Sequence, residues 1–277
     1  MVARGLARHL SGQRIATLAW ARRDIVRGGH IEALDRLAGR TIRSAEREGK
    51  AICIRLDGHI RMVVHLGMTG RLVVVPADTP EEPHTHLRID LAPCGRQLRY
   101  CDPRRFGGIW VVDEQLLQAG GPIQGRRLPP VAADPLTISW PAWRKALGRS
   151  RRIKALLMAQ EPISGLGNIY CDEALHRAGI HPLRPACSLT LEESRRLRAA
   201  VQRVLREAIR AGGSSISDYR DADNARGTFQ KRHRVYNRTG QPCRSCGTAI
   251  ERLIVDGRGT HFCPACQQLT GGGSRRG

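Results

Sequence analysis

Hydrophobic and polar positions change their spacing near the middle of the chain, from a strand-like to a helix-like pattern. Apolar residues four apart predict a short helix over residues 1–11. From about residue 50 to 112, short apolar or alternating runs stand between Gly and Pro: AICIRL, HIRMVVHL, RLVVV, LRIDL, RQLRYC and GGIWVV. The first two runs flank Asp57-Gly58 and predict a two-residue β-hairpin. We therefore predict an antiparallel β domain over residues 1–118.

Helical spacing dominates the second half of the chain. Residues 119–137 are rich in Gly and Pro and predict a linker to a helical domain over residues 138–234. Residues 141–160 have the periodicity of one helix. GNIYCDEALHRAG predicts a second helix, which Gly179 would end.

The longest helical pattern begins after residue 189 and runs to Gly212-Gly213. Thr190 and Glu193 have the spacing of a capping box at its start. Its apolar face consists of Leu197, Val201, Val204, Leu205 and Ala208. The chain is thus predicted to be an α+β protein. It has no apolar run of about 18 residues, so we expect no membrane span.

Two Cys-x-x-Cys pairs separated by sixteen residues predict a zinc site formed by Cys243, Cys246, Cys263 and Cys266. The strand-like segments AIERLIV and THFC lie between the pairs and are joined at Asp256-Gly257, so residues 235–267 predict a zinc ribbon. Four thiolates leave no open coordination position. We therefore expect one structural zinc ion, with the chemistry elsewhere in the chain.

The remaining cysteines are dispersed, and we expect all of them to be buried by packing: Cys53, Cys94, Cys101, Cys171 and Cys187. The N-terminal segment MVARGLARHL has Arg and His inside its apolar stretch and does not resemble a secretory signal. We therefore expect a cytoplasmic protein with reduced thiols. Residues 268–277 predict a disordered tail.

The charge of the chain points to an anionic partner. Lys and Arg number 46 against 25 Asp and Glu, which gives a net charge of +21 and a pI near 11.0. Charge of this size repels itself unless a polyanion is present, which favours nucleic acid. A solvated basic surface or an Arg-rich genome is the alternative, since only four residues are lysines.

Several segments occur in the order found in bacterial formamidopyrimidine-DNA glycosylases: HLGMTGRL, CDPRRFGG, GLGNIYCDEALHRAGIHP and RVYNRTGQPCRSC, followed by the ribbon. The chain resembles this family from residue 1 to about 267. The resemblance implies an N-terminal β-sandwich and a C-terminal helix-two-turns-helix domain, with DNA between them. It also implies a base-excision repair DNA glycosylase and AP lyase that flips and excises oxidised purines, such as 8-oxoguanine and formamidopyrimidines. The abasic site would then be cleaved by β,δ-elimination.

The resemblance implies that Met68, Arg104 and Phe106 form a wedge that fills the space left by a flipped nucleotide. Met68 and Phe106 each stand beside Gly in a turn-like segment, which favours exposed tips, although both could instead belong to the core. Arg105 continues the basic edge beside the wedge.

Other positions match DNA-binding residues of the family. Asn168 would hold a phosphate at a helix N-terminus, although it could simply be an N-cap. Tyr170 and Glu173 belong to the same motif, and Glu173 could be structural.

A basic run that includes Arg151 precedes Lys154, which matches a phosphate-binding lysine. A basic run alone is more often a solvated face. His65 and His86 fall where family members contact DNA, although a single histidine is more often structural.

Lys50 and Arg258 are the candidate catalytic residues. Lys50 starts a strand of the predicted hairpin and matches a lysine that assists elimination, with an exposed strand-end lysine as the alternative. Arg258 follows the predicted ribbon turn, where phosphate contact and a solvated loop arginine both remain open.

The chain departs from the family at its start. Family members begin Met-Pro-Glu-Leu-Pro-Glu, and the proline amine and the glutamate carry the chemistry; MVARGLARHL aligns with the helix that follows. Three explanations stay open: an internal methionine recorded as the start, a catalytically impaired paralogue that binds damaged or abasic DNA without excision, or another amine, from Met1 or Lys50. We favour the first, because the helix begins without a cap. As written, the chain is expected to be inactive or much weaker.

The segment RGTFQKRHRVYNRTGQPC resembles the branch of the family that acts on purine lesions. The expected partner is therefore double-stranded DNA containing oxidised bases. We further expect a monomer that works at the bacterial nucleoid.

Overall fold

The computed structural model describes residues 2–214 and 225–269. Its contacts divide the chain into two compact units: Met1–Pro129 with Gly212–Thr228, and Pro130–Ala211 with Phe229–Gly277. The division differs from the predicted domain boundaries, which assign residues 212–228 to the helical domain; those boundaries stay predictions. Residues 270–277 of the predicted tail (268–277) lie outside the described residues, as do residues 215–224 of the polar, loop-like stretch at 214–234.

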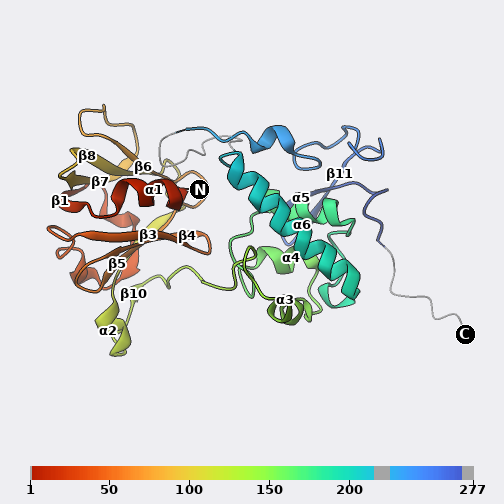
Figure 1. Cartoon of the computed structure of the whole chain (residues 1–277), viewed down its shortest axis with the longest axis horizontal. Coiled ribbons are helices and arrows are strands. Elements are labelled where there is room, and N and C mark those ends of the chain that lie inside the picture. Colours follow the sequence, from red (N-terminus) through yellow and green to blue (C-terminus); the bar gives the residue numbers. More distant parts are fainter. Residues whose placement is uncertain (1, 215–224, 270–277) are drawn as a thin grey trace, which may run out of the picture. The chain divides into compact units, whose positions relative to one another are not determined.

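The first unit is a β-sandwich (Figure 1). Its strands are β1 (Arg14–Trp20), β2 (Val26–Gly29), β3 (Ile42–Glu48), β4 (Ala51–Leu56), β5 (Ile60–His65), β6 (Arg71–Pro76), β7 (Thr85–Ala92), β8 (Arg96–Cys101), β9 (Gly108–Asp113) and β10 (Gln124–Gly125). One sheet has the order β1-β7-β8-β6 and the other β10-β2-β9-β5-β4-β3. Of these pairs only β2–β9 is parallel; the rest are antiparallel, as the alternating pattern predicts.

The core of the first unit lies between the two sheets. Alternate residues of the strands, such as Ile54, Val64, Ile89 and Leu98, are almost fully buried there. Burying each such side chain contributes about 1.5–3 kcal/mol. Helix α1 (Val2–Leu10) adds Leu6 to this core, which confirms the predicted N-terminal helix.

The predicted hairpin joins β4 to β5, but its loop has three residues rather than two. Asp57, Gly58 and His59 lie between the strands, and both Gly58 and His59 have positive φ. The prediction was wrong by one residue because His59 also adopts the left-handed conformation. After β9 follow α2 (Glu114–Gln118) and the short β10, which pairs with β2.

The second unit is helical. Its helices are α3 (Trp140–Leu147), α4 (Ile153–Met158), α5 (Asn168–Ala178) and α6 (Leu191–Arg210). The prediction of one helix over 141–160 was wrong: Gly148 ends α3, and Arg152 has an extended backbone before α4 begins. The resulting corner lets both helices bury their apolar faces in one core.

The ends of α5 and α6 agree with the predictions. Gly179 is left-handed and ends α5, while Thr190 and Glu193 form a complete capping box for α6. Short 3-10 turns cover Arg23–Ile25, Ile31–Ala33, Ala186–Ser188 and Phe229–Arg232. Among the described residues, no helix combines the length and the apolar character that a membrane crossing needs.

A two-stranded ribbon completes the second unit, with β11 (Glu251–Val255) antiparallel to β12 (Arg258–Phe262). Asp256 and Gly257 join the strands, and both have positive φ, as a primed two-residue turn requires. Of the five dispersed cysteines, Cys94 and Cys187 are exposed, so the expectation that all would be buried was wrong.

Candidate functional site

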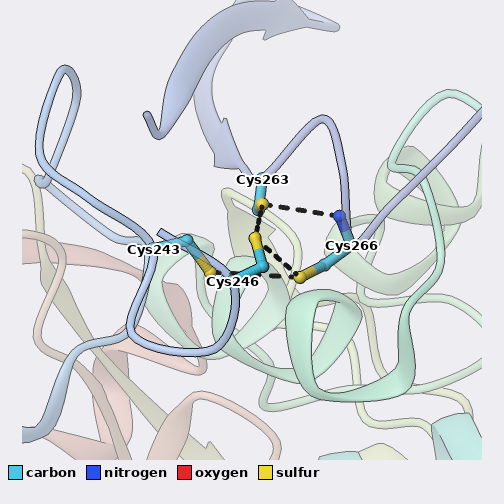
Figure 2. Close-up of side chains that lie close together, drawn as sticks. All are labelled: Cys243, Cys246, Cys263 and Cys266. Atoms are coloured by element: carbon cyan, nitrogen blue, oxygen red, sulfur yellow. Dashed lines mark hydrogen bonds between the residues drawn. The ribbon is translucent and has the colours of Figure 1, made fainter. Parts of the chain in front are cut away.

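Four cysteines of the ribbon form a metal site (Figure 2). All four Sγ atoms lie within 4.8 Å of one another, and three of the separations are 3.4, 3.5 and 4.0 Å. A tetrahedral zinc ion with Zn–S bonds of about 2.3 Å needs S–S separations of about 3.8 Å. The set therefore fits one structural zinc ion, held by Cys243, Cys246, Cys263 and Cys266.

Polar groups around the four sulfurs stabilise the negative charge of this site. Backbone N–H groups of Ser245 and Cys266 point at ligand sulfurs, each at 3.4 Å. His176, on α5, places Nε2 3.5 Å from Cys243 Sγ, while its Nδ1 is buried without a hydrogen-bond partner. Four thiolates around Zn²⁺ carry a net charge of −2, so such donors favour the bound metal.

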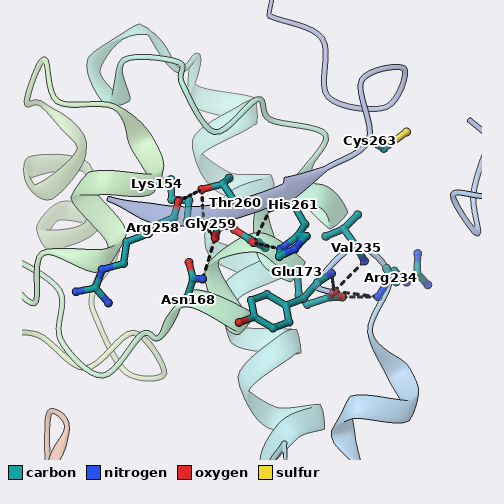
Figure 3. Close-up of polar contacts among 12 residues, drawn as sticks. Lys154, Asn168, Glu173, Arg234, Val235, Arg258, Gly259, Thr260, His261 and Cys263 are labelled. Atoms are coloured by element: carbon teal, nitrogen blue, oxygen red, sulfur yellow. Dashed lines mark hydrogen bonds and ion pairs between the residues drawn. The ribbon is translucent and has the colours of Figure 1, made fainter. Parts of the chain in front are cut away.

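The strand that carries Arg258 is held by side chains from α4 and α5 (Figure 3). Asn168 Nδ2 donates to the carbonyl oxygen of Gly259 at 2.9 Å. Lys154 Nζ donates to Thr260 Oγ1 at 2.7 Å and to the same Gly259 oxygen at 3.3 Å. Arg258 itself is the exposed first residue of β12.

Lys154 forms a buried ion pair with Asp172. Nζ lies 2.6 Å from Asp172 Oδ1, and the two side chains are 1% and 0% exposed. Burial lowers the pKa of Lys154 and the Asp172 carboxylate raises it. In this conformation the ammonium group is enclosed by protein oxygens. The phosphate contact expected for Lys154 stays a prediction, and in this structure its ammonium group contacts Asp172, Gly259 and Thr260.

Asn168 is the first helical residue of α5 rather than its N-cap, which is Gly167. The alternative interpretation as an N-cap was therefore wrong. Asn168 Oδ1 is buried without a hydrogen-bond partner. Tyr170 packs edge-on against Phe229, with ring centroids 5.8 Å apart.

Glu173 has a structural role, one of the two interpretations of its motif. Its carboxylate is fully buried and accepts the backbone N–H groups of Arg234, Val235 and Tyr236 at 2.9–3.0 Å (Figure 3). It therefore fixes the segment that leads into the ribbon.

Two loops of the first unit expose the predicted wedge. Met68, between β5 and β6, is 71% exposed, and Phe106, between β8 and β9, is 54% exposed. The guanidinium of Arg104 lies 4.4 Å from the centroid of the Phe106 ring, within range of a cation–π contact. Neither apolar side chain belongs to the core, so that alternative was wrong.

Asp102 joins the two wedge loops. Its buried carboxylate accepts Thr69 Oγ1 at 2.7 Å from one loop and Gly107 N at 2.8 Å from the other. Tyr100 Oη donates to it at 3.1 Å, and burial with the Asp102 charge raises the pKa of Tyr100. A Cβ at Gly107 would come within 2.4 Å of His65 O, so only glycine fits between the loops.

The two histidines differ in exposure. His86 is buried, with Nε2 2.9 Å from the carbonyl oxygen of Asp102, so in this structure it supports the wedge loops rather than reaching outward. His65 is partly exposed, and its Nδ1 accepts the N–H of Gly67 at 3.2 Å. Burial and the nearby charge of Lys50 lower the pKa of His65.

Lys50 is exposed in the turn that leads into β4, and its neighbour Ala51 pairs with His65.

Two of the predicted DNA-binding arginines are paired with exposed carboxylates. Arg105 lies 3.0 Å from Asp24, and Arg151 lies 3.1 Å from Asp256 at the ribbon turn. The predicted residues thus fall into two groups, one in each unit.

Asp102 and Asp172 hold the segments that carry predicted site residues, and neither was predicted from the sequence. Each is an acid within a basic chain and stands inside a motif that was noticed, CDPRRFGG and GNIYCDEAL. Their location inside these motifs was the one feature of the sequence that could have indicated them. Their partners lie up to 89 residues away in sequence, so the contacts follow only from the fold.

Comparison with known proteins gives matches along most of the chain. Residues 1–109 match the formamidopyrimidine-DNA glycosylase N-terminal domain, and residues 131–220 match the formamidopyrimidine-DNA glycosylase H2TH domain. Residues 240–269 match a zinc finger found in FPG and IleRS.

Similar proteins cover nearly the full length. The formamidopyrimidine-DNA glycosylase of Solibacter usitatus is 45% identical over 271 residues, which span 96% of each chain. The crystal structure of MutM (FPG) from Thermus thermophilus is 41% identical with a TM-score of 0.81 and covers 96% of both chains. A Lactococcus lactis FPG complexed with Fapy-dG-containing DNA is 32% identical with a TM-score of 0.83, covering 96% of this chain and 97% of that one.

Proposed function

Since the chain belongs to the formamidopyrimidine-DNA glycosylase family, we propose that its two groups of exposed residues grip duplex DNA around an oxidised purine. Members of the family are base-excision repair DNA glycosylases that also have AP lyase activity, and this function is carried over here. Solved relatives from Lactococcus lactis are complexed with DNA containing Fapy-dG or an abasic site.

The exposed wedge carries the proposal. Met68 and Phe106 leave large apolar surfaces in water, and a base stack is the surface that would cover them on DNA. When a nucleotide leaves the duplex, an apolar side chain can replace the lost stacking. Arg104 has donors that can pair with the base left behind.

Charged groups of both units would hold the backbone. Arg105 and His65 lie beside the wedge in the first unit, and Arg258 and Arg151 are exposed at the ribbon in the second. Phosphate contacts of this kind fix position without reading sequence. The start of α5, at Asn168, adds backbone N–H groups that favour an anion.

Lys50 is proposed to assist elimination at the abasic site. Lys50 is an exposed residue, and it lies in the same unit as the wedge, beside His65. An amine must lose its proton to attack the sugar or to relay a proton. Met1, whose amine is the other candidate, lies outside the described residues.

Borohydride trapping tests the enzymatic proposal. The 277-residue chain is incubated with 8-oxoguanine or abasic duplex and borohydride, and the covalent adduct is quantified. A glycosylase and AP lyase should give a covalent adduct and should bind a tetrahydrofuran abasic analogue tightly, and absence of any adduct would contradict the enzymatic proposal. The double variant Met68→Ala with Phe106→Ala should bind abasic duplex at least tenfold more weakly than the parent does. Its affinity for undamaged duplex should change less. Equal affinity of the double variant and the parent for abasic duplex would refute the wedge assignment.

We also propose that the protein acts as a monomer. Light scattering with a short abasic duplex should give one chain per duplex. A second chain per duplex would overturn this.

DNA as substrate would bring the protein to the nucleoid, which co-localisation of a fluorescent fusion with a DNA stain can test.

A further inference from the structure

Three polar side chains hold three consecutive residues of β12 directly after Arg258 (Figure 3). Asn168 and Lys154 both donate to the carbonyl oxygen of Gly259, and Lys154 also donates to Thr260 Oγ1. Asp172 accepts the backbone N–H of His261 at 2.9 Å, and its Oδ2 lies 3.3 Å from the ring Nδ1 of the same residue. Every one of these contacts joins α4 or α5 to the ribbon.

The ribbon needs contacts from α4 and α5 to keep a fixed position. β11 and β12 form a sheet of two strands, and an isolated two-stranded hairpin is marginally stable in water. The zinc ion would fix the end of the ribbon that carries Cys263, whereas Arg258 stands at the opposite end of β12, next to the turn. The position of Arg258 relative to α5 therefore depends on the contacts at Gly259, Thr260 and His261.

The stability of the fold alone does not require an ion pair between Lys154 and Asp172. Taking Lys154 and Asp172 out of water costs several kcal/mol for each ion, and well-packed apolar residues often replace such a pair without loss of stability. The charged pair orients β12 relative to α4 and α5, because each group also forms a hydrogen bond with a defined backbone or hydroxyl atom of β12.

We propose that Asp172 and Lys154 are positioning residues that set β12 so that Arg258 meets a DNA phosphate. This inference rests on the proposed function, in which Arg258 contacts DNA. Asp172 acts through Lys154 and the N–H of His261, and neither member of the pair touches DNA.

A double-mutant cycle with Arg258 tests the proposal. Affinity for a tetrahydrofuran-containing duplex, which needs no catalysis, is measured for the parent, Asp172→Asn, Arg258→Ala and the double variant. Asp172→Asn keeps the shape and the acceptor for His261 but removes the charge that orients Lys154. We expect about tenfold weaker binding for each single variant and no further loss in the double variant.

The salt dependence of binding gives a readout that a merely structural role would not move. Loss of one phosphate contact lowers the slope of log K against log salt by about one. Both Arg258→Ala and Asp172→Asn should show this decrease. If Lys154 instead contacts phosphate itself, Asp172→Asn releases it, and the affinity and slope should stay the same or rise, which would overturn the proposal.

Two further variants separate positioning from folding. Lys154→Met with Asp172→Leu replaces the charges by apolar side chains but leaves the His261 N–H without its acceptor, so zinc content should stay near that of the parent and the melting temperature should fall slightly, while binding weakens about tenfold. Glu207→Gln weakens a matched ion pair, Arg177–Glu207, that joins α5 to α6 away from β12. It should lower the melting temperature without changing DNA affinity.

The outcomes distinguish a failure of the positioning role from a failure of the proposed function. A parent chain without preference for abasic over undamaged duplex would contradict the proposed function itself. A parent chain with that preference, combined with independent and multiplicative losses from Asp172→Asn and Arg258→Ala, would reject only the positioning role. Parent-like binding by the apolar pair variant would reject it as well.

Discussion

Asp102 illustrates how one buried carboxylate can fix two loops that are separate in sequence. It accepts donors from Thr69, Tyr100 and Gly107 and has no exposure to solvent. Asp102→Asn leaves a buried donor or acceptor without its partner, which costs about 1–3 kcal/mol. We expect this loss of unfolding free energy in urea titration, together with weaker discrimination of abasic duplex.

The control for Asp102 is Asp90→Asn, which removes a partly exposed carboxylate on β7 that bonds Thr17 and Gln97. Water can replace those bonds, so a smaller effect on stability and none on DNA discrimination is expected. Equal effects from both variants would contradict the special role of Asp102.

His65 makes the free energy of unfolding depend on pH. Burial and Lys50 lower its pKa in the folded protein below the ordinary value of 6.5. The unfolded chain therefore binds this proton more readily, so the contribution to stability is full above pH 6.5 and falls as pH drops toward the folded pKa. One proton gives at most about 1.4 kcal/mol per pH unit, and partial exposure lowers this limit.

His65→Asn keeps an acceptor for the Gly67 N–H but does not titrate. Melting temperatures between about pH 7.5 and 5.5 should therefore fall less steeply for this variant than for the parent. Parallel curves for the two proteins would show that His65 does not contribute.

Single residues with a local signature were predictable, and those defined by distant partners were not. The four zinc ligands, Gly179 and the capping pair of α6 all follow from spacing within a few residues. Lys154 was assigned to phosphate by its match to a family lysine. The buried acid that engages it comes from another helix, and no pattern near Lys154 indicates it.

At the scale of elements, strands with a clear apolar face were predicted, whereas β1, β2 and β3, which lack one, were not. β4 to β9 bury nearly every second residue or more. The edge strand β1 buries one residue firmly, β2 contains two glycines, and β3 is largely polar. Such segments become strands because a neighbouring strand pairs with them, which a local pattern cannot show.

Helix α5 joins the helical core to the metal site, and His176 is the contact. His176→Phe keeps the approximate ring volume but removes the Nε2 atom that faces Cys243 Sγ. We expect zinc to be bound about tenfold more weakly, because such outer donors typically contribute about 10–100-fold in metal affinity. Competition with a chromogenic chelator measures it directly.

His181→Phe is the matched control for His176, since His181 packs against Phe262 and has no described contact with a ligand sulfur. Its zinc affinity should equal that of the parent. A loss of the same size in both variants would indicate a packing effect rather than a hydrogen bond to the thiolate.

At the scale of the whole molecule, the two units have separate hydrophobic cores. Cys246→Ser removes one zinc ligand, and the ribbon that carries Arg258 should lose its fold with the metal. We expect zinc and DNA binding to disappear together while the β-sandwich keeps its own melting transition. DNA binding that survives without zinc would make the ribbon a stabilising element rather than part of the grip.

Spacing and motifs in the sequence predicted an antiparallel β domain, a helical domain and a zinc ribbon, and the structure contains all three. The net charge of +21 indicates the class of partner without indicating which arginines meet it.

The ion pairs of Arg105 with Asp24 and of Arg151 with Asp256 act as intramolecular counter-ions. Each exposed pair is worth at most about 1 kcal/mol, so a phosphate can displace the carboxylate easily. We therefore expect undamaged DNA to compete with these carboxylates for the two arginines, which would shorten its dwell time on the protein. If the wedge adds contacts only at a lesion, the chain would leave undamaged sites quickly in spite of its high positive charge.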